Sequence, residues 1–222
     1  MNKNFGQNDP KIVDYVEKLF RPEDAILREV RIECERKGLP AIQVGSMDAL
    51  HLEVITRAIG AQKAVEIGTL GGYSGVSILR GMSPQGKLYT FEYVPLHAEV
   101  AKKSFENAGF ADRVEIYVGS ALANLPKIKS QGPFDLVFID ADKETYPYYL
   151  KWAAENLRIG GVVLGDNTFA WGRITDEAIE EPETQKSVLG LREFNQMAAQ
   201  GGRFRSTILP TGEGLTMAVK VK

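Results

Sequence analysis

Apolar positions in the first sixty residues recur with helical spacing. A second helix is predicted to begin at Pro22, with Asp24 in its first turn, and to end at Gly38 and Pro40. A third amphipathic stretch runs from about 46 to 59. The first stretch has one apolar face, made of Ile12, Val13, Val16, Leu19 and Phe20.

The pattern changes after residue 60, where short apolar runs alternate with helix-length segments. This alternation predicts βαβ units and a parallel sheet with helices on both faces. Near the end, 203–209 and 215–221 read as two strands of a hairpin without an intervening helix. The fold class is therefore α/β, Rossmann-like, with a seven-stranded, mostly parallel sheet. The five parallel strands are expected at 63–67, 87–92, 114–118, 134–140 and 161–165.

The bulk composition is that of one ordinary domain. We expect a single domain over 1–222, with N-terminal helices over 1–60 and the Rossmann-like core over 63–222. The chain has 27 Lys and Arg against 29 Asp and Glu, and a net charge of −2 does not favour a nucleic-acid partner. A polar N-terminus, no apolar run of about 18 residues and one cysteine, Cys34, predict a cytoplasmic protein with no membrane partner. The polar, acidic stretch 170–187 is expected to be a surface excursion near the ligand crevice.

A glycine-rich turn at 68–72 follows the first strand, where glycine lets the backbone approach a ligand. Twenty residues later the second strand ends at Glu92, whose carboxylate can accept hydrogen bonds from both hydroxyls of an adenosine ribose. The spacing differs from G-x-G-x-x-G, and Glu66 would repel a dinucleotide pyrophosphate but suits the amino acid part of S-adenosylmethionine. A turn that serves packing alone is the alternative. Ser74 would either contact the ligand or satisfy backbone donors at the helix start.

Oxygen-bearing side chains follow two further strands. Asp140 ends the strand 134–140, and Asp166 and Asn167 follow the next strand. Taken singly, Asp140 could cap a helix and the Asp-Asn pair could form an Asx turn. Since parallel strands deliver their carboxyl ends to one crevice, the groups together predict a site for Mg²⁺, with Ca²⁺ and Mn²⁺ as alternatives.

Lys143 is the candidate general base. It follows Asp140 by three residues and could take the proton of a phenolic hydroxyl whose pKa a cation has lowered. The alternative is a solvated lysine at a helix start. His51 and His97 lie in predicted helices and are expected away from the strand ends.

Three segments in combination resemble the cation-dependent O-methyltransferases, which include caffeoyl-CoA and catechol O-methyltransferases and many bacterial members. The likeness runs from about Tyr15 to the C-terminus and includes Leu-Pro-Ala-Ile-Gln-Val at 39–44. It implies the Rossmann-like S-adenosylmethionine-dependent methyltransferase fold, S-adenosylmethionine as methyl donor, a divalent cation and a homodimer. The three segments are Glu-Ile-Gly-Thr-Leu-Gly-Gly-Tyr-Ser at 66–74, Ile-Asp-Ala-Asp-Lys at 139–143 and Gly-Asp-Asn at 165–167.

The resemblance also assigns roles by position. Lys143 and Asp140 would be catalytic, and Tyr146 and Trp171 would face the acceptor unless they serve packing. The metal ligands would be Asp140, Asp166 and Asn167. The cofactor would be held by Val44, Glu66, Gly68, Thr69, Ser74, Glu92, Ala121 and Asp140.

The predicted function is metal-dependent O-methylation of a catechol-like small molecule. The insertion at 174–185 is acidic and would disfavour the phosphates of a coenzyme A thioester. The same chemistry on a hydroxylated uridine of transfer RNA is one alternative. An NAD-dependent oxidoreductase and a ligand-binding domain without turnover are alternatives from other classes.

Overall fold

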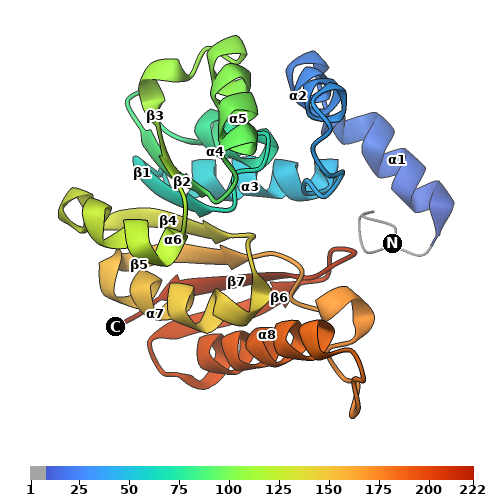
Figure 1. Cartoon of the computed structure of the whole chain (residues 1–222), viewed down its shortest axis with the longest axis vertical. Helices are drawn as coiled ribbons and strands as arrows, with labels where there is room; N and C mark the ends of the chain where they lie inside the picture. The colour runs from blue at the N-terminus through green and yellow to red at the C-terminus, as the bar shows by residue number, and fades with distance from the viewer. Residues whose placement is uncertain (1–8) are drawn as a thin grey trace.

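The computed structural model describes residues 9–222, so the predicted absence of an apolar leader at 1–8 falls outside the described residues. Seven strands form one sheet in the order β3-β2-β1-β4-β5-β7-β6 (Figure 1). Strands β1 to β5 pair in parallel, and β7 runs antiparallel between β5 and β6. This confirms the predicted sheet and its terminal hairpin. The strands are β1 (Lys63–Ile67), β2 (Lys87–Glu92), β3 (Val114–Val118), β4 (Phe134–Ile139), β5 (Leu157–Gly165), β6 (Phe204–Leu209) and β7 (Leu215–Lys220).

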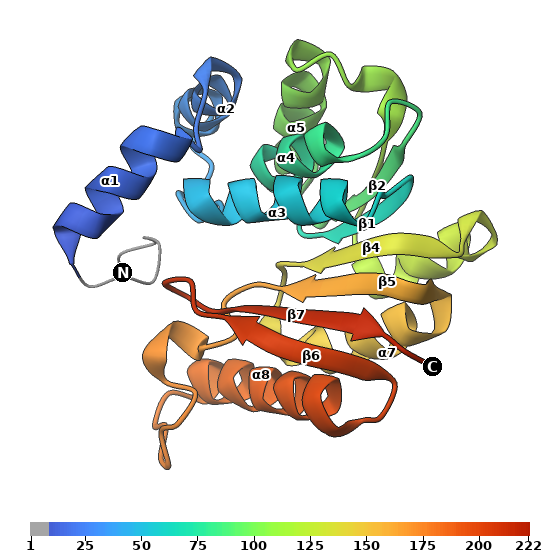
Figure 2. The ribbon, with the colours of Figure 1, turned by 180° about the vertical axis from the view of Figure 1, so that it is seen from behind.

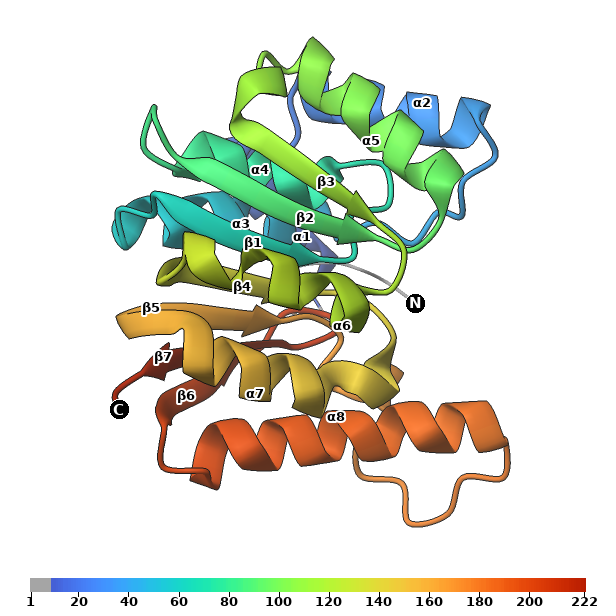
Figure 3. The same ribbon diagram turned by 60° about the vertical axis from the view of Figure 1, so that its left-hand side comes forward.

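Helices cover both faces of the sheet. Figure 3 shows α6 and α7 in front of the sheet and α3 and α4 behind it. The N-terminal helix α1 lies on the outside of the molecule, beyond α2 and α3 (Figure 2). Within residues 9–222, no helix combines the length and apolarity needed to cross a bilayer. The helices are α1 (Pro10–Phe20), α2 (Ala25–Arg36), α3 (Ser46–Ala58), α4 (Tyr73–Gly81), α5 (Pro95–Asn107), α6 (Ala121–Asn124), α7 (Tyr146–Asn156) and α8 (Pro182–Gln200), with short 3-10 turns η1 (Ala111–Arg113), η2 (Leu125–Gln131), η3 (Lys143–Thr145) and η4 (Ala170–Gly172).

The central strands are apolar on both faces because each face meets a helical layer. On β1 and β4, Ala64 and Leu136 belong to the core shared with α2 to α5. Their neighbours Val65 and Val137 belong to the opposite core, shared with α7 and α8. Successive residues of a strand point to opposite faces, so a strand between two layers reads as a continuous apolar run.

Three predicted boundaries were wrong by three residues or more. Helix α2 begins at Ala25, because the side chain of Asp24 is its N-cap and accepts a hydrogen bond from Leu27 N at 3.0 Å. Strand β5 begins at Leu157 instead of at 161, and it continues through a glycine pair at 160–161. The residues 182–187, expected in a surface excursion, form the first turns of α8.

Candidate active site

A cavity of about 950 Å³ opens at the carboxyl ends of β1, β2 and β4. It lies where the strand order reverses between β1 and β4, the point at which open α/β sheets bind ligands. Helix α2 contributes Val30, Arg31 and Cys34 to the wall, so part of the N-terminal region closes the site. Nine predicted site residues line the wall: Val44, Gly68, Thr69, Ser74, Glu92, Ala121, Asp140, Lys143 and Asn167.

The glycine turn requires glycine at its first position. Gly68 has φ +101°, and a Cβ there would lie 1.9 Å from the backbone oxygen of Asp140. The amide of Gly68 donates to Phe91 O at 3.0 Å, and that of Asp140 donates to Ile67 O at 2.8 Å. The turn thus holds the ends of three strands against one another, which a side chain would prevent.

Glu66 lies behind the cavity wall and is fully buried. Its carboxylate accepts hydrogen bonds from Ser74 Oγ and Thr90 Oγ1, both at 2.6 Å. Burial raises the pKa of Glu66 to about 7. Ser74, rather than Glu66, stands at the cavity surface, so direct contact between Glu66 and the cofactor stays a prediction.

Glu92 occupies the wall at the end of β2. Its two oxygens accept hydrogen bonds from Leu70 N at 2.8 Å and Val94 N at 2.9 Å. The prediction that His97 lies away from the strand ends was wrong, since its Nδ1 is 3.4 Å from Glu92 Oε1 and it lines the cavity. Helix α5 begins directly after β2, so the first turn of α5 stays at the strand end. The short spacing from Glu92 was the available signal.

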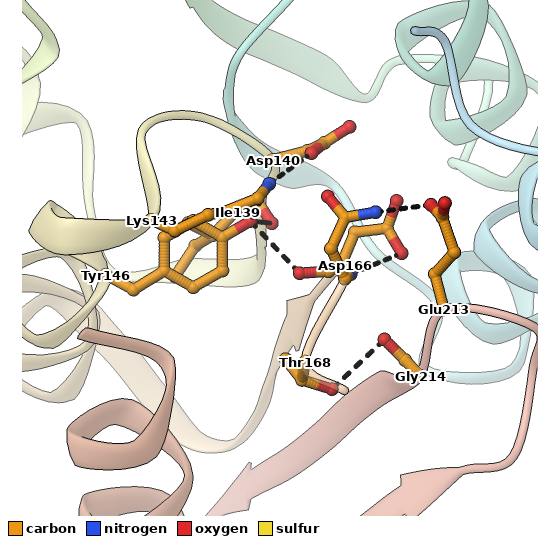
Figure 4. A network of polar contacts seen from close by, with 9 residues as sticks. Ile139, Asp140, Lys143, Tyr146, Asp166, Thr168, Glu213 and Gly214 are labelled. Atoms are coloured by element: carbon orange, nitrogen blue, oxygen red, sulfur yellow. Dashed lines mark hydrogen bonds and ion pairs between the residues drawn. The ribbon is translucent and has the colours of Figure 1, made fainter. Parts of the chain in front are cut away.

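Lys143 is buried beside Asp140, with 8% of its surface exposed. Its Nζ donates to Asp140 Oδ1 and to the hydroxyl of Tyr146, both at 2.8 Å (Figure 4). The alternative of a solvated lysine is therefore wrong.

Tyr146 begins α7 and is completely buried. Its hydroxyl lies 3.0 Å from Ile139 O and 3.2 Å from Asp166 O, the acceptors for its single proton. Burial raises the pKa of Tyr146 well above its ordinary range, so the hydroxyl keeps this proton. Of the two alternatives for Tyr146, the structure contradicts the one in which it faces the acceptor, because its side chain is completely buried in the core and does not line the cavity. Trp171, by contrast, lines the cavity.

Asp166 and Asn167 form a tight turn after β5. Asp166 Oδ1 accepts from Asn167 N at 2.8 Å, and Asn167 has φ +58°. Burial, with the charges of Asp140 and Asp48, raises the pKa of Asp166 well above its ordinary range. Asn167 reaches the cavity wall, while the almost fully buried Asp166 lies behind it.

Glu213 was missed by the sequence analysis. It lies in the loop between β6 and β7, is 7% exposed and lines the cavity. Asn167 Nδ2 donates to Glu213 Oε2 at 2.5 Å, and Thr168 Oγ1 donates to Gly214 O at 3.0 Å (Figure 4). These contacts fix the amide of Asn167 with its oxygen available as an acceptor. In the sequence, Glu213 stands between two turn glycines and gives no sign of this role.

The metal site predicted from the sequence consists of two carboxylates and one amide. Across residues 9–222, no group of three or more His, Cys, Asp and Glu side chains has an arrangement that could hold a metal ion. The predicted set of Asp140, Asp166 and Asn167 contains only two such side chains, so metal binding there stays a prediction.

Known proteins resemble the chain over nearly its whole length. Residues 17–221 match the family described as O-methyltransferase. Catechol O-methyltransferases of Mycobacterium tuberculosis and Niastella koreensis are 38% and 36% identical over 205 and 197 residues, covering 92% and 88% of this chain and 91% and 87% of theirs. The crystal structure of the O-methyltransferase from Bacillus cereus in complex with SAH (S-adenosylhomocysteine) is 34% identical, with a TM-score of 0.87, and the match covers 95% of this chain and 97% of that one.

The doubly wound sheet, with a glycine turn and Glu92 at its crevice, defines a Rossmann-like S-adenosylmethionine-dependent methyltransferase. The chain belongs to the O-methyltransferase family, and S-adenosylmethionine is its methyl donor. This assignment excludes the alternative of an NAD-dependent oxidoreductase.

Proposed function

We propose that the enzyme methylates one hydroxyl of a catechol-type small molecule with the help of a divalent cation, Mg²⁺ in the first instance. The observation that carries this proposal is the group of Asp140, Lys143 and Asn167 on one cavity wall, with Asp166 directly behind them. The catechol O-methyltransferases among the relatives support the class of acceptor.

The residues at the ends of β4 and β5 fit a hard cation. Asp140 and Asp166 offer carboxylate oxygens, and the bond from Asn167 to Glu213 leaves the amide oxygen of Asn167 as an acceptor. A buried carboxylate close to others is costly unless positive charge neutralises it, and Asp166 is in this position. When bound, a divalent cation lowers the pKa of a hydroxyl that it coordinates.

Lys143 would act as the general base that accepts the proton of the acceptor hydroxyl. Its Nζ, held by Asp140 and Tyr146, takes the proton from the acceptor hydroxyl. The acceptor oxygen then forms a bond to the methyl carbon, and the bond between that carbon and the sulfonium sulfur breaks with its electron pair left on sulfur. The protein contributes chiefly by holding the two reactants in line.

The acidic segment that follows the cavity-lining Trp171 favours a small acceptor. Arg173 pairs with Asp176 at 2.9 Å and with Glu181 at 3.1 Å. Glu177 and Glu180 remain exposed, so this segment keeps negative charge. Such a charge would repel the phosphates of a coenzyme A thioester.

A panel of acceptors with and without metal tests the proposal. Catechol should be methylated with Mg²⁺, phenol should not, and EDTA should abolish the reaction until Mg²⁺ is restored in excess. Asp166→Asn and Asn167→Ala should lose both activity and calorimetric Mg²⁺ binding, whereas the exposed Glu144→Gln should retain both. Methylation that survives EDTA would refute the metal requirement. Transfer to a transfer RNA carrying hydroxylated uridine, with none to catechol, would replace the proposed acceptor.

A further inference from the structure

The hydroxyl of Tyr146 is the meeting point of three parts of the active site. It accepts a hydrogen bond from Lys143 Nζ at 2.8 Å. It faces Ile139 O at 3.0 Å and Asp166 O at 3.2 Å, the first at the end of β4 and the second just after β5 (Figure 4). One oxygen atom therefore links the buried lysine to the two strand ends that carry Asp140 and Asp166.

Helix α8 packs against both the ring of Tyr146 and the backbone of Lys143. The ring of Phe194 meets that of Tyr146 edge-on, with centroids 5.3 Å apart and planes at 75°. Gly190 lies so close to η3 that a Cβ there would be 2.4 Å from Lys143 O. The backbone of Lys143 and the tyrosine ring are thus fixed from the same side, which leaves the lysine side chain as the movable part.

Two hydrogen bonds hold the lysine nitrogen. Among residues 9–222, Asp140 and Tyr146 are the hydrogen-bond partners of Lys143 Nζ. A tetrahedral nitrogen that donates to both has one position left for an acceptor hydroxyl. The lysine side chain is flexible, so the loss of one hydrogen-bond partner leaves its nitrogen free to take several positions around the remaining partner.

We propose that Tyr146 is a positioning residue for methyl transfer, whose hydroxyl fixes Lys143 Nζ and ties the ends of β4 and β5 together. The inference rests on the proposed function, in which Lys143 takes the acceptor proton. A tyrosine that served packing alone would tolerate loss of its hydroxyl without a change in chemistry.

Tyr146→Phe removes the hydroxyl and keeps the ring against Phe194. We expect kcat with catechol to fall about 10- to 100-fold, since the hydrogen bond that holds the reacting nitrogen of Lys143 in place is lost. The KM for catechol and the calorimetric Kd for S-adenosylhomocysteine should change little. Tyr148→Phe is the matched control, because Tyr148 lies on the same helix but is 59% exposed. An unchanged kcat in Tyr146→Phe would overturn the proposal.

A double-mutant cycle separates positioning from general stability. In a Lys143→Met background, Tyr146→Phe should cause no further loss of the residual rate, measured with a radiolabelled methyl donor. An equal loss in both backgrounds would assign Tyr146 a structural role and overturn the proposal. Full activity in Lys143→Met alone would instead refute the proposed base.

A second variant covers the case in which Tyr146→Phe does not fold. Phe194→Leu keeps the hydroxyl but loosens the tyrosine ring, and should lower kcat by a smaller factor that disappears in the Lys143→Met background. An unchanged kcat, or a loss that persists without Lys143, would count against the positioning role.

Discussion

Replacing Glu66 with glutamine should change how the stability of the protein depends on pH. Glu66 is fully buried, and its carboxyl bonds to the hydroxyls of Ser74 and Thr90. Burial raises its pKa from the ordinary value of 4.5 to about 7. Each pKa unit corresponds to about 1.4 kcal/mol, so the folded protein favours the protonated form of Glu66 by about 3 kcal/mol.

Whether the free energy of unfolding rises or falls with pH depends on which state of the chain, folded or unfolded, keeps the proton of Glu66. Below pH 4.5, Glu66 is protonated in both the folded and the unfolded chain, and its protonated form adds no pH dependence. Between pH 4.5 and about 7 the unfolded chain loses the proton while the folded protein keeps it. The folded state then binds more protons, so the free energy of unfolding falls as the pH rises. The loss reaches about 3 kcal/mol above pH 7.

Urea unfolding of the wild type and of Glu66→Gln, measured at intervals from about pH 4.5 to 8, tests this reasoning. Glutamine carries no titrating proton, so the variant should gain stability relative to the wild type across this range. Glu144→Gln, at an exposed position, should follow the wild-type curve. Parallel curves for the wild type and Glu66→Gln would refute the assignment of a raised pKa to this group.

Three further substitutions probe how the site is assembled. Gly68→Ala should cost about 2 kcal/mol or more in the free energy of unfolding and abolish calorimetric binding of S-adenosylhomocysteine. The reason is that its Cβ would lie 1.9 Å from a backbone oxygen at the end of β4. A variant of wild-type stability would contradict this prediction and show that the turn can relax. Gly190→Ala should lower kcat by about 100-fold through displacement of Lys143, with cofactor affinity kept, and an unaltered kcat would contradict this. Glu213→Ala should weaken Mg²⁺ binding by about 10- to 100-fold, since Asn167 loses the partner that orients its amide. Glu213→Gln should bind Mg²⁺ nearly as tightly as the wild type. Equal Mg²⁺ affinities in both variants would argue against an orienting role for Glu213.

The sequence by itself predicted the sheet because its information is local and repeated. Strands covered by helices on both faces must be apolar throughout, and five such runs separated by helix-length segments admit few arrangements. The order of the strands also predicted that Asp140 lies near Asp166 and Asn167, since parallel strands end at one edge of a sheet. The start of α2 could also have been predicted from the sequence, because the preference of Asp24 for the N-cap position depends only on its neighbours in the chain.

The tertiary structure alone decided which side chains complete the site. The bond from Asn167 to Glu213 joins residues 46 positions apart, and no local pattern marks either as a partner. Tyr146 could belong to the core or to the cavity until the phase of α7 against Phe194 was known. Hydrophobic periodicity specifies which face of an element is buried. The neighbours that it meets there depend on how the layers pack, so the surroundings of Lys143 could be seen only in the folded molecule.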